Sequence, residues 1–132
     1  MIHVLIADDR PVVRAGLSHF IEKTTDIIVS GEATQGTAIL EVLRTRHLDL
    51  LLLDMSMPDI NGIELIRRVR VEWPALAILI MSEQNEAPAV SRALRAGATG
   101  YVAKDTDHEI LIGAVYEARI ATSSENRTSR LL

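Results

Sequence analysis

Five times along this chain a short apolar run gives way to a segment with the period of an α-helix, and this alternation restricts the possible folds more than any other feature. The runs are apolar at successive positions, which is typical of strands buried on both faces of a sheet. Strands joined by helices run parallel, with right-handed crossovers in the great majority of cases. The pattern predicts an α/β fold, a three-layer sandwich with helices on both faces of a five-stranded parallel sheet. We expect strands at residues 2–7, 27–30, 50–53, 77–81 and 100–103. The first helix should begin at residue 11, and the other four should cover residues 37–46, 63–72, 88–97 and 107–119.

Proline and glycine mark several ends of these helices. Pro11 suits the first turn of a helix, where its missing N–H is not needed. Trp73 precedes Pro74 and is therefore biased away from the α region, which predicts the end of the third helix. Gly97 is a candidate C-cap for the fourth helix. The connections between elements are accordingly short.

Composition excludes several classes of protein. A net charge of −4 argues against a domain that binds nucleic acid by itself, since such binding rests on a basic surface. No apolar run approaches the ~18 residues of a membrane span, so no membrane association is expected. No basic segment or cleavage site of a signal peptide precedes the first strand. The absence of cysteine excludes disulfides and thiolate chemistry and favours a cytoplasmic location.

Chemically active side chains follow or end four of the predicted strands. They are Asp8 and Asp9, Asp54, Ser82 and Lys104. The carboxyl ends of parallel strands meet at one edge of a sheet, and ligands bind there. If the first and third strands are neighbours, the three carboxylates share one crevice at that edge.

Three carboxylates in one crevice require a counter-charge. Two of them ~4 Å apart repel by about 4 kcal/mol at an effective dielectric constant near 20. Mg²⁺ suits this position because it prefers hard oxygen ligands and is often shared with a phosphate. The Asp54 carboxylate could then attack phosphorus to give an acyl phosphate, with Lys104 offsetting charge on the phosphoryl oxygens.

Taken singly, each residue has a simpler interpretation. Asp8 and Asp9 could cap the helix that begins at Pro11, and Ser82 could cap the fourth helix. Lys104 could be a surface lysine in a loop, and Tyr101 could be a packing residue with a polar tip. Only their joint placement after successive strands favours a reaction centre.

Four stretches resemble the receiver domains of two-component response regulators. They are LIADDRPVVRAGL, LLLDMSMPDINGIEL, ILIMSEQ and ATGYVAKD, in this order and at the proper spacing. The resemblance covers residues 1–119 approximately. It implies the flavodoxin-like receiver fold with strand order 2-1-3-4-5. It also implies a receiver domain at residues 1–121 and a polar tail, or the start of a linker, at residues 122–132.

The resemblance further implies the roles of the site residues. Asp54 would accept a phosphoryl group from a sensor histidine kinase, and the domain would catalyse this step on itself without turning over a substrate. Asp8 and Asp9 would hold Mg²⁺, or Mn²⁺, together with Asp54 and the backbone carbonyl of Ser56. Lys104 would pair with the phosphoryl group.

A second set of roles concerns the signal. By the same resemblance, Ser82 and Tyr101 would form the switch pair that responds to the phosphoryl group. The surface of the fourth helix, fifth strand and fifth helix would serve output or homodimer formation.

Other residues resemble the NarL/FixJ subfamily of transcription factors. Asp105 follows Lys104 where many receivers have proline, and GEATQGTAIL and LRAGATGYVAKD are similar to that subfamily. Its members carry a C-terminal helix-turn-helix domain, so the chain is either a receiver fragment or a stand-alone receiver. We expect the fragment, which reaches DNA only through an output domain absent from this chain. The sequence departs from the family at Arg10, where histidine is usual, which adds a cation near the pocket. It also departs in YEARIATS, which lacks the glycine common at the end of the last helix.

Two other functions would require features that this sequence lacks. A metal-dependent phosphatase would need an acid–base group two residues after Asp54, and Ser56 cannot serve as an acid. A flavin or dinucleotide module would need a glycine-rich phosphate loop, whereas ADDRPVV follows the first strand.

Overall fold

Strands and helices alternate strictly along the computed structural model, which describes residues 1–59, 61–83 and 87–122. The strands are β1 (Ile2–Ala7), β2 (Ile27–Ala33), β3 (Leu50–Asp54), β4 (Ala77–Ser82) and β5 (Gly100–Ala103). The helices are α1 (Pro11–Glu22), α2 (Gly36–Thr45), α3 (Gly62–Glu72), α4 (Ala87–Ala96) and α5 (His108–Thr122).

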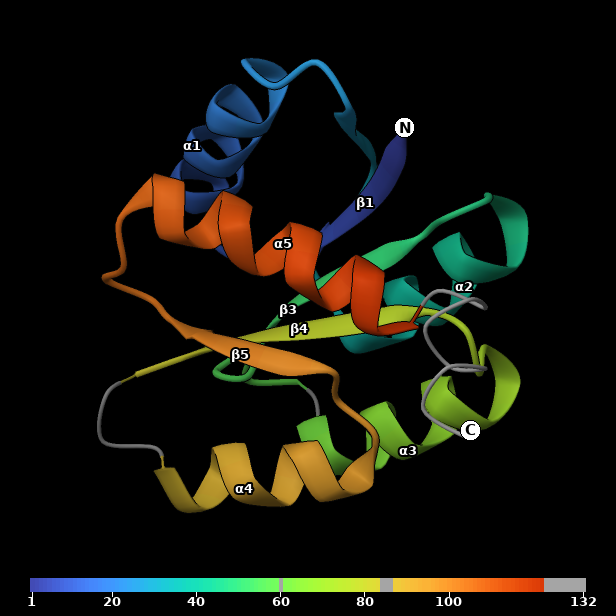
Figure 1. Ribbon diagram of the computed structural model, residues 1–132. Helices are drawn as coiled ribbons and strands as arrows, with labels where there is room; N and C mark the ends of the chain where they lie inside the picture. The colour runs from blue at the N-terminus through green and yellow to red at the C-terminus, as the bar shows by residue number, and fades with distance from the viewer. Residues whose placement is uncertain (60, 84–86, 123–132) are drawn as a thin grey trace, which may run out of the picture.

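The sheet has the strand order β2-β1-β3-β4-β5, with every neighbouring pair parallel (Figure 1). This order confirms the predicted α/β sandwich and its flavodoxin-like topology. Ala7 pairs with Leu53, and Asp54 pairs with Met81. The carboxyl ends of β1, β3 and β4 are therefore level at one edge of the sheet.

Successive residues of the central strands face opposite layers of helices, as the side-chain period of a strand requires. Helices α1 and α5 lie on one face of the sheet, and α2, α3 and α4 lie on the other (Figure 1). Leu51 and Leu53 belong to the core under α2, α3 and α4, whereas Leu50 and Leu52 belong to the core under α1 and α5. Both faces are buried, which explains why β3 has leucine at each of positions 50–53.

Strand β2 is longer than the sequence predicts, because it continues past Ser30 to Ala33. The pairing with β1 shifts between Val4 and Leu5, so that Ser30 has no partner in the register and Gly31 pairs with Leu5. A Cβ atom on Gly31 would lie 2.9 Å from a methyl group of Val42. Glycine is thus required by close approach to α2, rather than by a loop.

The last helix also extends beyond its predicted end at residue 119. Thr122 belongs to α5, and its hydroxyl donates to the carbonyl of Ala118. Thr122, the first residue of the expected polar tail, is thus the last residue of the helix. The remaining residues of that tail, 123–132, lie outside the described part of the chain. Among the described residues no helix is long and apolar enough to cross a bilayer.

Arg70 joins the carboxyl ends of α3 and α4. Its Nη1 donates to the carbonyls of Trp73, Pro74 and Leu76 at 3.2, 3.1 and 2.7 Å. Nε and Nη2 donate to the carbonyl of Gly97 at 3.0 and 2.8 Å. Gly97 has a φ of 130°, which favours glycine and agrees with the predicted C-cap. One guanidinium thus binds carbonyls in the segments that follow two helices and holds these segments together.

Candidate functional site

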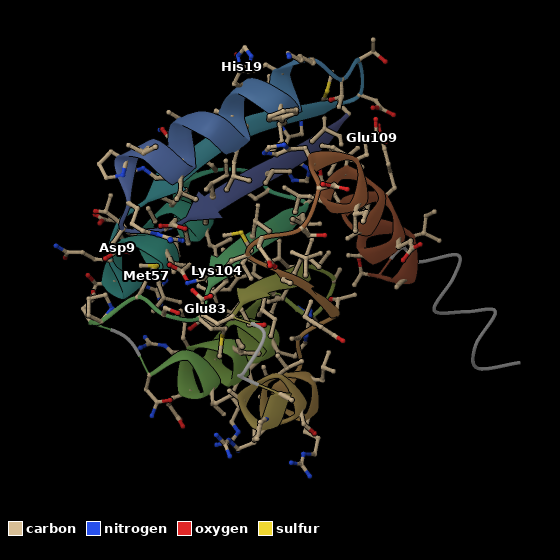
Figure 2. The ribbon with its side chains drawn as sticks, turned by 90° about the vertical axis from the view of Figure 1, so that its left-hand side faces the viewer. Asp9, His19, Met57, Glu83, Lys104 and Glu109 are labelled. Carbon is tan, nitrogen blue, oxygen red and sulfur yellow. The ribbon has the colours of Figure 1, made fainter. Side chains whose placement is uncertain are left out.

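The ends of three parallel strands bring the predicted charged residues to one edge of the sheet. Asp8 follows β1, Asp54 is the last residue of β3, and Lys104 follows β5. Figure 2 shows Asp9, Lys104 and Glu83 at this edge, far from His19 and Glu109. Strands β1 and β3 are neighbours, so the acidic residues come together as the sequence predicts.

The three carboxylates form a compact cluster. Each of Asp8, Asp9 and Asp54 offers an oxygen, and these oxygens all lie within 4.8 Å of one another. Asp8 and Asp54 are 0% and 1% exposed, whereas Asp9 is open to solvent. An octahedral Mg²⁺ with oxygens at ~2.0–2.1 Å brings its ligands to ~3–4 Å of one another. The donor set and its spacing therefore fit Mg²⁺ after a small inward shift.

Lys104 and Ser56 hold the Asp54 carboxylate. Lys104 Nζ lies 2.7 Å from Asp54 Oδ1, and its side chain is 11% exposed. The N–H of Ser56 donates to the same oxygen at 2.9 Å. Lys104 also donates to Ser56 Oγ at 2.8 Å and pairs with Glu83 at 3.6 Å. The resemblance gives Ser56 a role only through its backbone carbonyl, as a metal ligand, and does not predict this contact of its hydroxyl.

Arg10 places a second cation among the carboxylates. Its Nε donates to Asp8 Oδ1 at 3.1 Å and its Nη2 to Asp8 Oδ2 at 3.0 Å. Nη2 also lies 3.7 Å from Asp54 Oδ2. The hydrogen bond to Asp8, and then the charges of Asp8, Asp54 and Asp9, raise the pKa of Arg10 further above its ordinary value. The protein thus supplies part of the counter-charge that the sequence assigned to a metal ion.

The capping alternative for the acidic pair is wrong. The residue that caps α1 is Arg10, and its side chain makes no capping hydrogen bond. The Asp8 side chain instead accepts from the N–H and the guanidinium of Arg10. Asp8 therefore turns the loop and binds a cation, rather than satisfying the helix.

Arg14 supports the site from behind, and sequence reasoning missed it. Its Nη1 donates to the backbone carbonyl of Asp8 at 2.8 Å, and its Nε lies 3.7 Å from Glu32 of β2. The signal was its position four residues after Arg10, one helical turn from the residue that caps α1. It fixes the loop that carries Asp8 and Asp9.

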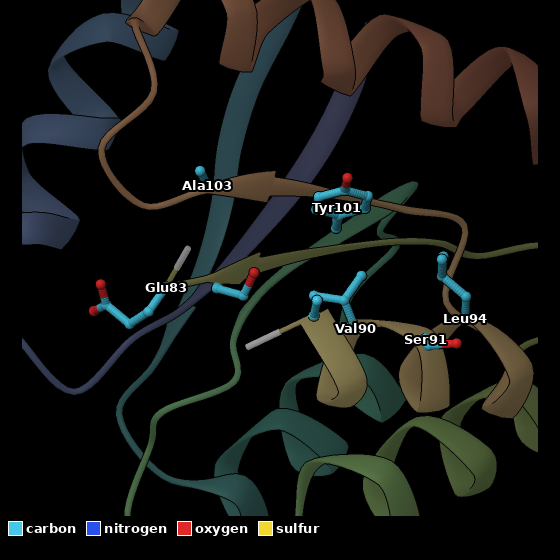
Figure 3. Close-up of a pocket in the computed structure, with 8 residues that line it drawn as sticks. Glu83, Val90, Ser91, Leu94, Tyr101 and Ala103 are labelled. Carbon is cyan, nitrogen blue, oxygen red and sulfur yellow. The ribbon is translucent and has the colours of Figure 1, made fainter. Parts of the chain in front are cut away.

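Ser82 and Tyr101 lie on the other side of this edge, on neighbouring strands. Ser82 is the buried last residue of β4, and its carbonyl accepts from the N–H of Lys104 at 2.9 Å. Tyr101 in β5 is 56% exposed. Both line a groove of about 270 Å³ between β4, β5 and α4, with Val90 and Leu94 on the helical wall (Figure 3). The site and this groove are therefore contiguous through Ser82.

Comparison with known proteins agrees with this geometry. Residues 4–116 match the family model of the response regulator receiver domain. The chain is 36% identical over 115 residues to the nitrate/nitrite response regulator protein NarL of Escherichia coli strain K12, covering 87% of this chain and 53% of NarL. The chain spans about half the length of the curated relatives it matches.

Two solved structures are similar over most of the chain. The signal receiver domain of NarL from Mycobacterium tuberculosis is 32% identical, with a TM-score of 0.82, over 89% of this chain and 95% of that one. RcsB from Salmonella enterica serovar Typhimurium, bound to a promoter in the presence of the phosphomimetic BeF3−, is 29% identical. Its TM-score is 0.79, over 87% of this chain and 66% of that one.

Proposed function

The chain belongs to the response regulator receiver domain family, and on that premise we propose that it accepts a phosphoryl group on the Asp54 carboxylate. The observation that carries the proposal is the position of this carboxylate, buried at the end of β3 and 2.7 Å from Lys104. Asp54 also shares a candidate cation site with Asp8 and Asp9. The proposed nucleophile Asp54, the cation Lys104 and the candidate metal ligands thus lie at one edge of the sheet.

The chemistry follows from these contacts. One oxygen of Asp54 forms a bond to phosphorus as the bond between phosphorus and the donor atom breaks, and the electron pair of that bond leaves with the donor group. An ionised carboxylate needs no base for this attack. Bound Mg²⁺, or Mn²⁺, would offset charge on the phosphoryl oxygens. Lys104 lies close enough to Asp54 to contact the same oxygens, while the N–H of Ser56 keeps the carboxylate oriented.

Partners follow from the family. We propose a sensor histidine kinase as the phosphodonor, and a C-terminal output domain in the native protein that binds DNA. RcsB, in the comparison above, is bound to a promoter. The surface of α4, β5 and α5 is the proposed homodimer contact, and a cytoplasmic location is proposed for the whole protein. The family generally does not turn over a substrate, so self-phosphorylation is the proposed extent of its catalysis.

We propose Ser82 and Tyr101 as the switch. Ser82 would bond a phosphoryl oxygen, and Tyr101 would move from solvent into the groove beside Val90 (Figure 3). Reversing a population from 1:99 to 99:1 requires about 5.5 kcal/mol. A few hydrogen bonds to ionised groups contribute ~1.5–3 kcal/mol each, which is sufficient.

Intact mass measures the proposed modification. After incubation with acetyl phosphate and Mg²⁺, the wild-type chain should gain the mass of one phosphoryl group, and Asp54→Asn should gain none. Asp59→Asn is the matched control, because Asp59 is an exposed aspartate in the loop that follows β3. Asparagine at this position can still accept the hydrogen bond from the N–H of Gly36. Equal labelling of wild type and Asp54→Asn would refute the proposal.

The switch is tested on the same samples. Phosphorylated wild-type protein should show changed ring resonances for Tyr101, one of the chain's 2 tyrosines. Ser82→Ala should still gain the phosphoryl mass but leave these resonances unchanged. A full Tyr101 response in Ser82→Ala would exclude Ser82 as the switch.

A further inference from the structure

Arg10 binds the carboxylate of Asp8, one of the three carboxylates of the candidate metal site. Both oxygens of Asp8 accept hydrogen bonds from its guanidinium, at 3.1 and 3.0 Å. The same group lies 3.7 Å from Asp54 Oδ2. Asp8 is fully buried, so the guanidinium is the principal source of positive charge that satisfies it. The cation position between Asp8 and Asp54 is thus filled by an arginine side chain.

A divalent cation and this guanidinium exclude one another. An ion bound to Asp8 and Asp54 would stand within a few ångströms of Nη2, where like charges repel in a poorly solvated crevice. A metal–oxygen bond to Asp8 would add to the three hydrogen bonds that its oxygens already accept from Arg10, which leave about one lone-pair position of the carboxylate. Repulsion by the ion therefore weakens the two hydrogen bonds of the guanidinium to Asp8 and favours its movement away.

The structure gives Arg10 a route out of the site. Its side chain is 46% exposed although its partner is fully buried. It precedes Pro11, whose ring holds the backbone at the start of α1 while the side chain can rotate. Lys104 contacts Asp54 rather than Asp8, and Arg14 contacts the backbone of Asp8, so neither competes for the Asp8 carboxylate.

We propose that Arg10 is a built-in competitor for the divalent cation: it fills the cation position of the metal-free site and leaves when the ion binds, so that it sets the metal affinity of the receiver. The proposal rests on the proposed function, because it takes the Asp8, Asp9 and Asp54 cluster as the metal site. It adds a specificity-determining residue to that site. The histidine that is usual in the family at this position could not donate to both oxygens of Asp8 as the guanidinium does.

Calorimetric titration of the metal-free chain with MgCl2 measures the competition directly. Arg10→Gln should bind Mg²⁺ about tenfold more tightly than wild type, the factor that corresponds to one lost charge-assisted hydrogen bond. Arg10→Lys keeps the charge but cannot hold both oxygens of Asp8, so its affinity should lie between the two. Arg67→Gln removes the same charge from an exposed position on α3 and should leave the affinity unchanged.

Thermal unfolding distinguishes competition between Arg10 and the metal ion from a purely structural role of Arg10. Without metal, Arg10→Gln should melt below wild type, because the acidic cluster loses a counter-charge. With saturating Mg²⁺ its melting temperature should rise by more than that of wild type. A lower melting temperature that Mg²⁺ does not recover would mean that Arg10 only supports the fold, and would overturn the proposal.

The remaining outcomes separate this proposal from the proposed function. Mg²⁺ affinities of wild type and Arg10→Gln within twofold of each other, with Asp54 still phosphorylated, would overturn the competition alone. An equal gain in Arg67→Gln would also overturn it, since net charge would then explain the effect. Failure of every variant to bind Mg²⁺ would overturn both the competition and the metal site.

Discussion

The ion pair between Lys104 and Asp54 carries a stability prediction that follows from its burial. Both side chains are removed from solvent, at 11% and 1% exposed, and their charged atoms are 2.7 Å apart. Truncation of one partner of a buried pair costs ~3–5 kcal/mol, because the other charge is left without compensation. Here the N–H of Ser56 and the guanidinium of Arg10 still face the carboxylate, which reduces the loss. We expect Lys104→Met to lower the free energy of unfolding by about 2–4 kcal/mol in the absence of metal.

The same change in an Asp54→Asn background should cost much less. Asparagine leaves no buried negative charge for the missing ammonium to offset, so Lys104→Met should lower the free energy of unfolding by about 1 kcal/mol or less there. The difference between the two backgrounds is the coupling energy of the pair. Urea unfolding in the presence of EDTA measures all four proteins, and unchanged m-values show that the same surface unfolds in each.

A control and a refuting result complete this cycle. Arg44→Met removes a cation from the exposed pair with Glu72 at 3.4 Å and should cost ~1 kcal/mol or less. If Lys104→Met costs the same with aspartate and with asparagine at position 54, the two charges do not interact in the folded protein. The arrangement from which Asp54 phosphorylation is inferred would then be wrong.

Two further predictions concern the scaffold. Arg70→Met should lower the free energy of unfolding by about 2–3 kcal/mol in urea, because carbonyls in the segments that follow α3 and α4 lose a charged donor. Arg68→Met, which removes an exposed pair at 3.8 Å on the same helix, should cost ~0.5 kcal/mol or less, and equal costs would refute the bridging role of Arg70. The hydrogen bond to Asp26 raises the pKa of Tyr116 above its ordinary 10.0, so the stabilisation it contributes is present below that pH and is lost as the pH rises through the folded pKa. Asp26→Asn should therefore lower the pH at which Tyr116 ionises in an ultraviolet titration, and an unchanged titration would contradict this.

Sequence patterns predicted the sheet and the convergence of the acidic residues because both depend on few variables. Apolar runs fix which segments are strands, helical crossovers make them parallel, and parallel strands end at one edge. Asp54 and Asp8 therefore lie at the same edge, and they are adjacent there because β1 and β3 are neighbours. The order of strands came from the resemblance, since periodicity does not distinguish neighbours.

Contacts that depend on side-chain conformation could not be predicted in this way. Arg70 appears in the sequence as one of several charged residues on α3, and only the packing of α4 shows that it lies between two helix ends. Ser30 lies at a shift in the β1–β2 register, next to Gly31 where α2 approaches the strand closely. The hydrogen bonds from Arg10 to both oxygens of Asp8 likewise depend on the side-chain conformation of Arg10, which the charges of the folded site favour.

Charge balance explains how the site can be stable without metal and would still gain from a divalent ion in the proposed phosphorylation. The three carboxylates outnumber the cations Arg10 and Lys104 by one, so the metal-free cluster carries only a small net charge. A phosphoryl group on Asp54 would add roughly one further negative charge or more, by analogy with other phosphorylated side chains. Arg10 can neutralise Asp8 or approach the phosphoryl oxygens, but a single guanidinium bound across Asp8 cannot offset both. Asp8, Asp9 and Asp54 would hold a divalent ion that supplies the additional charge, and Arg10, with its side chain 46% exposed, would then be free to turn toward solvent.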